Sequence, residues 1–199
     1  MNPRQLVITV VILVAASLGM ALYAWRMQKH ARTTVPAAYS GSVAPPASGS
    51  TEQATLFVAD DSSGELQPQQ ASIPLSEDRQ QRAQQLVRAL LNIYLDKNSS
   101  HPIAPGSDVR DAYLVDPGIA VIDMNSAFAD GHRSGILVED LTVASLVETV
   151  AQNIPGILRV KILVNGQERD TLAGHADLSI LYDVPSVNQM VGPSPSPSQ

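Results

Sequence analysis

The stretch VNGQERDTLAGHADLS, residues 164–179, holds the side chains most suggestive of catalysis. His175 lies near Asp170 and Asp177, and residues two apart in an extended chain share a face, so Asp177 is placed to orient an imidazole that acts as a general base. Hydrolysis by such a pair also needs a nucleophile, and the chain has no G-x-S-x-G elbow. We therefore predict that His175 closes the turn after Gly174. The alternative is a tethered envelope hydrolase that uses His175 with an acidic partner.

A second oxygen-rich stretch, DMNSAFADGH, could suggest a metal site through Asp123, Asn125, Asp130 and His132. An EF-hand calcium loop needs ligands at alternate positions and a glutamate at the twelfth, but alternation stops at Ala127 and the twelfth residue is Ser134. Zinc needs a third ligand that this stretch lacks. The sequence therefore predicts loop and capping residues here, and no metal.

Two other polar pairs have a structural and a functional interpretation. Asp60 and Asp61 follow a short apolar run and could pair as acid and base, but a solvated turn before Gly64 explains them equally. Glu148 and Thr149 fall within a predicted helix, where they line either its polar face or an interaction surface. No residue of the chain is thus assigned a catalytic, cofactor-binding or metal-binding role.

The elements that must position these side chains follow from periodicity and turn signals. Apolar residues recur at helical spacing after an N-cap at Ser76 and again over 138–153, where Pro155-Gly156 ends the pattern. Asn165-Gly166 is a strong hairpin signal, because both central residues of a type I′ turn need positive φ. The predicted elements are strand 54–60, extended segment 65–75, helix 76–96, hairpin 111–125, helix 138–153, strand 157–164 and return strand 168–174.

This order of elements predicts an α+β fold. Each helix has one apolar face, which must pack on a sheet, so we expect a small two-layer domain with two helices on a mixed, mostly antiparallel sheet. No strand–helix unit carries a Gly-rich first turn, which excludes the nucleotide-binding folds built on that loop.

Composition excludes several kinds of site and partner. The chain has no cysteine, so disulfides, thiolate metal sites, thiol nucleophiles and a lipidated cysteine anchor are all ruled out. Residues 54–199 carry nine basic and eighteen acidic side chains. So acidic a segment repels phosphate backbones, and we predict no nucleic-acid partner. No cofactor is predicted either.

The N-terminal residues predict a membrane anchor. Residues 6–25 run without a charged side chain, and as a helix they would span about 30 Å, which is roughly one hydrocarbon core. The predicted organisation is an anchor over 1–26, a flexible linker over 27–53, a folded domain over 54–183 and a disordered Pro/Ser tail over 184–199. The count of Lys and Arg around the anchor favours a cytoplasmic domain, but long domains translocate largely regardless of such charges, so counting alone leaves the orientation open.

The folded segment resembles the GerMN family, the GerM-type sporulation and spore germination domain. The similarity rests on TLFVAD, AQQLVRALL, DAYLVDPGIAVIDMNSAF, LTVASLVETVAQNIPGILRVKILVNGQ and LAGHADLS. The resemblance implies a domain similar to ring-building modules, placed outside the cytoplasm, with no enzymatic activity. Relatives in spore formers are often lipoproteins with paired domains, and this chain departs from that pattern.

These observations predict a single-pass membrane protein of the bacterial cell envelope that displays one non-catalytic binding or assembly module outside the cytoplasm. The expected partners are the membrane and envelope or assembly proteins, including further copies of the chain. Exposed sheet edges and the helical layer are the surfaces where such partners could bind. A sensor of soluble ligands is a third hypothesis, which requires an apolar pocket.

Overall fold

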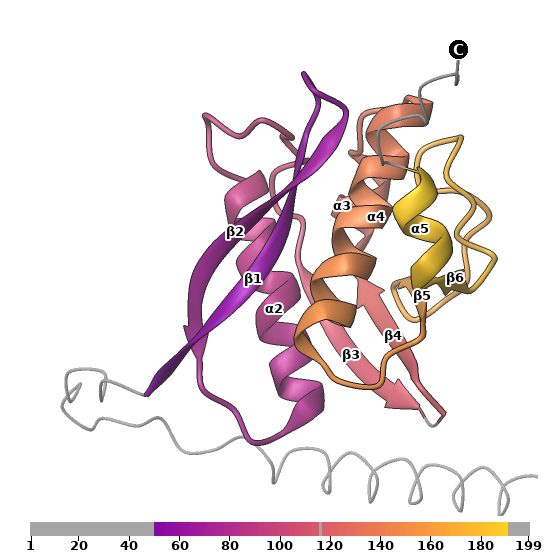
Figure 1. Ribbon diagram of the computed structural model, residues 1–199. Coiled ribbons are helices and arrows are strands. Elements are labelled where there is room, and N and C mark those ends of the chain that lie inside the picture. Colours follow the sequence, from indigo (N-terminus) through magenta and orange to yellow (C-terminus); the bar gives the residue numbers. More distant parts are fainter. Residues whose placement is uncertain (1–49, 116, 191–199) are drawn as a thin grey trace, which may run out of the picture. The chain divides into compact units, whose positions relative to one another are not determined.

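The computed structural model describes residues 50–115 and 117–190 of the chain (Figure 1). Its elements, in chain order, are β1 (Thr51–Asp60), β2 (Glu65–Pro74), α2 (Arg79–Tyr94), β3 (Val109–Val115), β4 (Ile119–Met124), α3 (Ser126–Asp130), α4 (Ile136–Asn153), β5 (Arg159–Val164), β6 (Tyr182–Asp183) and α5 (Val184–Met190). The predicted anchor and most of the predicted linker lie outside the described residues. None of the helices within the described ranges is long and apolar enough to cross a membrane.

The strands form two separate sheets. β1 and β2 make an antiparallel hairpin, and the other four form a sheet in the order β3-β4-β5-β6. Within it, β4 and β5 run parallel and the other neighbours run antiparallel. The α+β class and the mixed, mostly antiparallel pairing are thus confirmed, whereas the single sheet is corrected to two.

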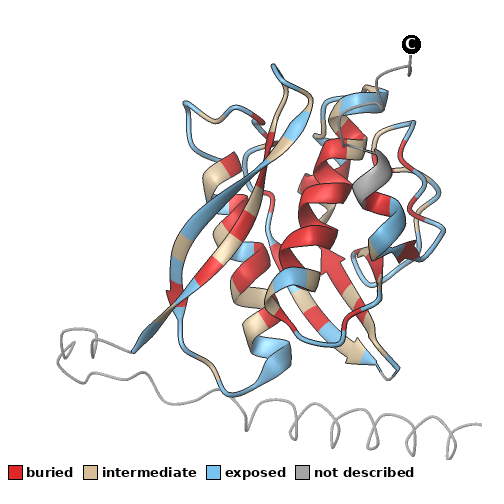
Figure 2. Cartoon of the chain, in the orientation of Figure 1, coloured by how far each residue is buried: buried red, intermediate tan, exposed pale blue. Residues whose placement is uncertain are grey.

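The two long helices lie between these sheets, so the two-layer prediction was wrong. α2 contacts both strands of the β1–β2 hairpin and also β3, while α4 contacts β1 on one side and β5 on another (Figure 1). Every residue of α4 from Leu141 to Val150 is buried (Figure 2). A helix that is buried all round needs neighbours on every side, and α2 and α5 supply the remaining ones.

Side chains of α4 bind the backbone of β1 along the edge that faces away from β2. Asn153 accepts a hydrogen bond from the Thr55 N–H at 3.1 Å and donates to the Thr55 carbonyl at 2.7 Å. Thr149 accepts from the Phe57 N–H at 3.0 Å, and Ser145 donates to the Phe57 carbonyl at 2.5 Å. These three residues follow one another at a spacing of four, so one face of the helix satisfies an edge that would otherwise be open.

The same edge is completed at Ala59. Its N–H donates to the Tyr94 hydroxyl at 2.9 Å, and its carbonyl accepts from Ser100 Oγ at 2.9 Å. The backbone groups of three alternate β1 residues are therefore all paired with side chains. Buried backbone groups must find such partners, and these hold the hairpin against the helices.

A similar arrangement covers part of the outer edge of β3. Gln84 donates to the Arg110 carbonyl at 3.1 Å, and Arg88 donates to the Val109 carbonyl at 3.3 Å. Both lie on α2, four residues apart. The sheet edges that we expected to be open to partners are thus occupied at β1 and partly occupied at β3.

Two predicted boundaries are corrected by the structure. The N-cap of α2 is Asp78, whose carboxylate accepts from the Gln80 N–H at 2.9 Å, while Ser76 donates to the Asp78 carbonyl. The folded part also extends beyond Asp183 into α5, where Val187 is buried.

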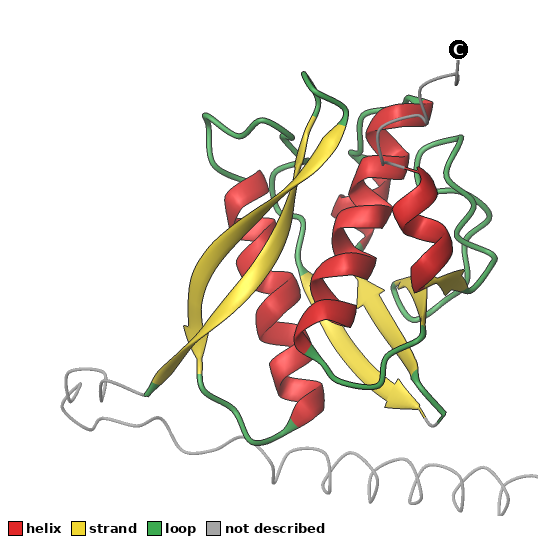
Figure 3. Cartoon of the chain, in the orientation of Figure 1, coloured by secondary structure: helices red, strands yellow, loops and turns green. Residues whose placement is uncertain are grey.

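The predicted return strand over 168–174 is absent. Asn165 and Gly166 do make the expected turn, with φ of 53° and 75°, but Val164 and Gln167 form a single bridge. A long loop follows and leads to β6 (Figure 3), which pairs with the start of β5. Residues 168–171 offer no apolar alternation to continue a strand, so the loop takes their place.

Candidate functional site

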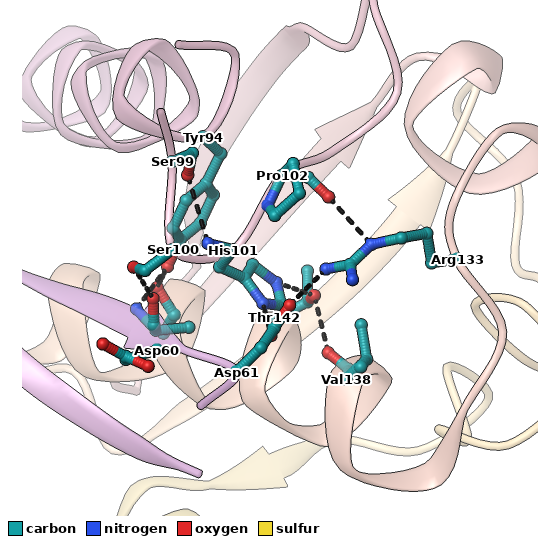
Figure 4. A network of polar contacts seen from close by, with 12 residues as sticks. Asp60, Asp61, Tyr94, Ser99, Ser100, His101, Pro102, Arg133, Val138 and Thr142 are labelled. Carbon is teal, nitrogen blue, oxygen red and sulfur yellow. Dashed lines mark hydrogen bonds and ion pairs between the residues drawn. The ribbon is translucent and has the colours of Figure 1, made fainter. Parts of the chain in front are cut away.

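The most triad-like arrangement in the structure involves a histidine that the sequence did not single out. His101 Nδ1 lies 2.6 Å from Asp61 Oδ1, and His101 Nε2 lies 2.6 Å from the Thr142 hydroxyl (Figure 4). Arg133 donates to the other oxygen of Asp61 at 2.5 Å. In an open site, this order of hydroxyl, imidazole and carboxylate would activate a nucleophile.

Burial excludes that role. The side chain of His101 is fully buried, and Thr142 is 1% exposed. The Thr142 hydroxyl is also committed to the Val138 carbonyl at 2.9 Å and to His132 Nε2 at 2.8 Å. A nucleophile that no substrate can approach is a structural hydrogen-bonding group, so we interpret the arrangement as a buried polar network.

The electrostatics of this network follow from its contacts. Burial alone would raise the pKa of Asp61, but hydrogen bonds from His101 and Arg133 outweigh it and hold the pKa below its usual range. Burial lowers the pKa of His101, with Asp61 acting in the opposite direction. Burial lowers the pKa of His132 as well. The carboxylate is therefore charged at neutral pH and pairs with the guanidinium.

Asp60 and Asp61 do not form the acid–base pair that was considered. Asp60 Oδ1 accepts from the N–H groups of Ser62 at 2.8 Å and Ser63 at 3.2 Å, which caps the turn before Gly64. Asp61 turns to His101, forty residues further along the chain. The interpretation as a turn residue therefore holds for Asp60 alone. Asp61 contacts His101 because the fold brings the two distant segments together.

His175 has an acidic partner, but neither of the two suggested by proximity in sequence. Its Nδ1 lies 2.9 Å from Oε1 of the fully buried Glu139. Asp177 instead accepts from the backbone N–H and hydroxyl of Ser179. The Ser134 hydroxyl lies 3.4 Å from His175, but it faces the same Nδ1. In a catalytic triad the nucleophile and the carboxylate lie on opposite ring nitrogens, so these three residues are not arranged as a triad.

Glu139 organises the loop that carries His175. Its Oε2 accepts from the N–H groups of Ala173 at 2.9 Å, His175 at 2.9 Å and Ala176 at 3.0 Å. Its Oε1 accepts from the Gly135 N–H at 3.0 Å as well as from His175 Nδ1. Burial would raise the pKa of Glu139, but these donors lower it to about 2. The Gly-His step is thus held by a single buried carboxylate.

The residues of the considered metal stretch serve separate structural roles. Asp123 accepts from the Gly166 N–H at 2.6 Å, Asn125 caps α3 by accepting from Phe128 N–H at 3.1 Å, and Asp130 pairs with Arg169. Over the described residues, no three His, Cys, Asp or Glu side chains lie close enough together to hold a metal ion.

The Glu148–Thr149 pair divides between two environments. Thr149 binds the backbone of β1. Glu148 is 7% exposed, its Oε1 has no hydrogen-bond partner among the described residues, and burial raises its pKa. Neither residue forms part of an open surface.

Two surface features remain. One is a hollow of about 540 Å³ lined by six polar and two apolar residues, which are Val58, Gln69, Asn92, Ile93, Asp96, Asn98, Ser99 and Ser100. The other is an apolar surface on the four-stranded sheet.

This apolar surface lies on the face of β3 and β4 that points away from the helices. Tyr113 pairs with Val121, and Val115 pairs with Ile119; we call these four residues the outer patch. Tyr113 is 44% exposed and Val115 48% exposed, while the other two are half-buried. Their neighbours in sequence, Ala112 and Ala120, are buried on the opposite face. The outer patch is therefore the solvent side of a sheet whose other side forms the core.

Comparison with known proteins identifies the family. A family model described as "Germane: Sporulation and spore germination" matches residues 55–170, which is more than half of the chain. The chain belongs to this family. The predicted GerMN-type domain is thereby confirmed, and the description of the Germane family names no enzymatic activity.

Two solved structures are similar to this chain. The tandem GerMN domains of the sporulation protein GerM from Bacillus subtilis match with a TM-score of 0.50 and 22% identity, over 64% of this chain and 44% of that one. The first GerMN domain of the same protein matches with a TM-score of 0.47 and 20% identity, over 64% and 93% of the two chains. At this identity the likeness to the tandem structure shows a shared fold. A comparison with curated proteins found no significant match.

Proposed function

We propose that this Germane-family chain is a membrane-tethered module of the bacterial cell envelope that binds another envelope protein outside the cytoplasm. Family membership supports a role related to sporulation or spore germination. The uncharged run over 6–25 supports the tether. On this proposal the domain is non-catalytic.

The observation that carries the binding role is the outer patch. Tyr113 and Val115 expose nearly half of their surface in two apolar cross-strand pairs. Arg159 lies beside Ile119 on β5, and Asp183 lies beside Arg159 on β6. An apolar centre with a charged rim is the usual composition of a protein–protein contact, and tyrosine is enriched in such contacts.

Two observations support a binding role over a catalytic one. Among the described residues, catalytic residue types come together around His101 and around His175. The arrangement around His101 is buried. At His175, both Glu139 and Ser134 face Nδ1, so Ser134 is not placed as a nucleophile on the opposite ring nitrogen. The edge of β1 is occupied by side chains of the helices and the loop after α2, and the edge of β3 is partly occupied by side chains of α2. A partner with an apolar surface, bound at the outer patch, would account for the exposure of Tyr113 and Val115.

The test is site-specific photocrosslinking of the full chain in intact cells. A photoreactive residue at position 115 is expected to capture a discrete partner. The same residue at Gln70, exposed on the β1–β2 hairpin, is the matched control. Capture at 70 but not at 115 would refute the proposed surface. Protection of the domain from external protease, under conditions where an extracytoplasmic protein is digested, would refute the proposed topology.

A further inference from the structure

The hollow beside the end of α2 is built from three parts of the chain. The β1–β2 hairpin, the last turn of α2 and the loop that follows α2 each contribute lining residues. Its volume of about 540 Å³ lies within the range of about 300–1,000 Å³ that is typical of small-molecule sites. The hollow is therefore large enough to hold a small ligand.

The loop that forms one wall of the hollow is held in place by hydrogen bonds. Ser100 Oγ donates to the Ala59 carbonyl at 2.9 Å, and the Asp61 N–H donates to the Ser100 carbonyl at 3.2 Å. Ser99 Oγ accepts from the N–H of His101 at 3.2 Å, and the side chain of His101 is fully buried (Figure 4). A wall that is already ordered loses little conformational entropy when a ligand binds.

The backbone of the two strand residues in the lining is already paired within the hairpin. The N–H groups of Phe57 and Ala59 donate to helix side chains on the side away from β2. Backbone groups alternate in direction along a strand, so those of Val58 point towards β2. By the same alternation, Gln69, which is the partner of Leu56, points its backbone groups towards β1. The hairpin therefore meets a ligand in the hollow with side chains.

Three primary amides in the lining are left for a ligand. Among the described residues, the side chains of Gln69, Asn92 and Asn98 make no hydrogen bond, and all three residues are exposed. One oxygen of Asp96 accepts from the Asn98 N–H at 2.8 Å, which leaves the other oxygen to accept from a ligand. Each amide offers two N–H donors and one accepting oxygen.

The charge and polarity of the lining define the kind of ligand. Of the eight lining residues, Asp96 alone carries a charge. A lone carboxylate repels anionic ligands and falls short of the ligand set that a bound metal ion requires. A hydroxyl both donates and accepts, so a ligand rich in hydroxyls can pair with the amides and the carboxylate together. The C–H faces of a sugar ring are apolar and suit Val58 and Ile93.

We propose that the hollow binds a neutral saccharide, with the side-chain amides of Gln69, Asn92 and Asn98 as its polar contacts. The sugar hydroxyls donate to Asp96 and to the amide oxygens, and they accept from the amide N–H groups. A peptide fits less well, because peptides that bind beside a strand pair with open backbone groups, and those of the lining strands are occupied. The hollow shares no residue with the outer patch, so the two sites are tested separately.

The experiment is an NMR titration of the side-chain amide groups in the full chain, held in a detergent whose headgroup is not a sugar. The probes are a tetrasaccharide of glucose and a tetrasaccharide of N-acetylglucosamine, with tetra-alanine as the peptide comparison. At millimolar concentration, at least one saccharide is expected to cause saturable shifts at the amides of Gln69, Asn92 and Asn98. No shift is expected at Gln152, an exposed amide of α4 outside the lining.

Substitutions then assign the binding to the hollow. Asn92→Ala combined with Asn98→Ala is expected to weaken saccharide binding about tenfold or more, since each lost hydrogen bond costs about threefold to tenfold in affinity. Gln152→Ala is the matched control and should leave the affinity unchanged. An unchanged unfolding midpoint of the double variant would show that the loss lies in binding and not in folding.

Three results would overturn the proposal. The first is the absence of saturable shifts with both saccharides, and the second is a response to tetra-alanine that equals or exceeds the response to the saccharides. The third is a saccharide affinity that the double variant does not reduce. If the double variant does not fold, the natural chain still decides the outcome, because a lack of response at its three lining amides refutes the site.

Discussion

Replacing Glu139 with glutamine should disrupt the hydrogen bonds that hold the loop carrying His175. Glutamine has nearly the same shape, but one of its two terminal atoms donates. At least two of the five donors that face Glu139 would then meet an NH₂ group. A buried donor left without an acceptor costs about 1–3 kcal/mol.

The pKa of Glu139 gives an independent magnitude for the same loss. A shift from 4.5 to about 2 corresponds to about 3 kcal/mol of stability at neutral pH. This stability is fully present above about pH 4.5 and is lost as the pH falls through about 2, because the pKa is depressed in the folded state. Protonated glutamate and glutamine both carry a donor, so the substitution should cost about as much as protonation.

The assay is urea unfolding of both proteins at several pH values. Glu139→Gln is expected to lower the free energy of unfolding by about 3 kcal/mol at pH 7 and by roughly half as much at pH 3. Asp140→Asn is the matched control, since it removes one carboxylate charge at the neighbouring residue. Burial and the charge of Glu139 already raise the pKa of Asp140, so neutralising it should not destabilise the fold. If the free energies of unfolding of the natural chain and Glu139→Gln differed by the same amount at pH 7 and pH 3, the reasoning would be refuted.

Two further substitutions test the structural roles of polar side chains. Asn153→Ala should lower the free energy of unfolding by about 1–3 kcal/mol, because it leaves both backbone groups of Thr55 unpaired. Urea unfolding measures this loss, and Gln152→Ala, at an exposed position of the same helix, is the control. Equal losses in the two variants would contradict the role of Asn153 at the β1 edge. His175→Ala should cost about 1–2 kcal/mol through loss of the Glu139 contact, which thermal unfolding would detect; an unchanged midpoint would disprove that structural role.

Local signals in the sequence predicted local structure well. The Asn165-Gly166 turn, the β3–β4 hairpin and both long helices depend on neighbouring residues, and all are present. The N-cap lies two residues after the predicted one. Ser76 and Asp78 are both good capping residues, and Asp78 is the one whose carboxylate accepts from the Gln80 N–H.

Long-range pairings were not predictable in the same way. The amphipathic stripe of α4 indicated an apolar face, but its serine, threonine and asparagine bind β1 across about ninety residues of sequence. Likewise, His101 meets Asp61 across forty residues, and His175 meets Glu139 across thirty-six. A single sequence shows which residues can hydrogen-bond, whereas the fold determines which of them do.

The central claim is that this domain works by binding through its outer patch and not by chemistry at His175. The most direct test compares two variants, Tyr113→Asp and His175→Ala, for partner capture by a photoreactive residue at position 115 in intact cells. We predict that Tyr113→Asp abolishes capture while its unfolding midpoint stays unchanged, and that His175→Ala retains capture despite its lower stability. Full capture by Tyr113→Asp, together with loss of cellular function in a stably folded His175→Ala, would contradict the account.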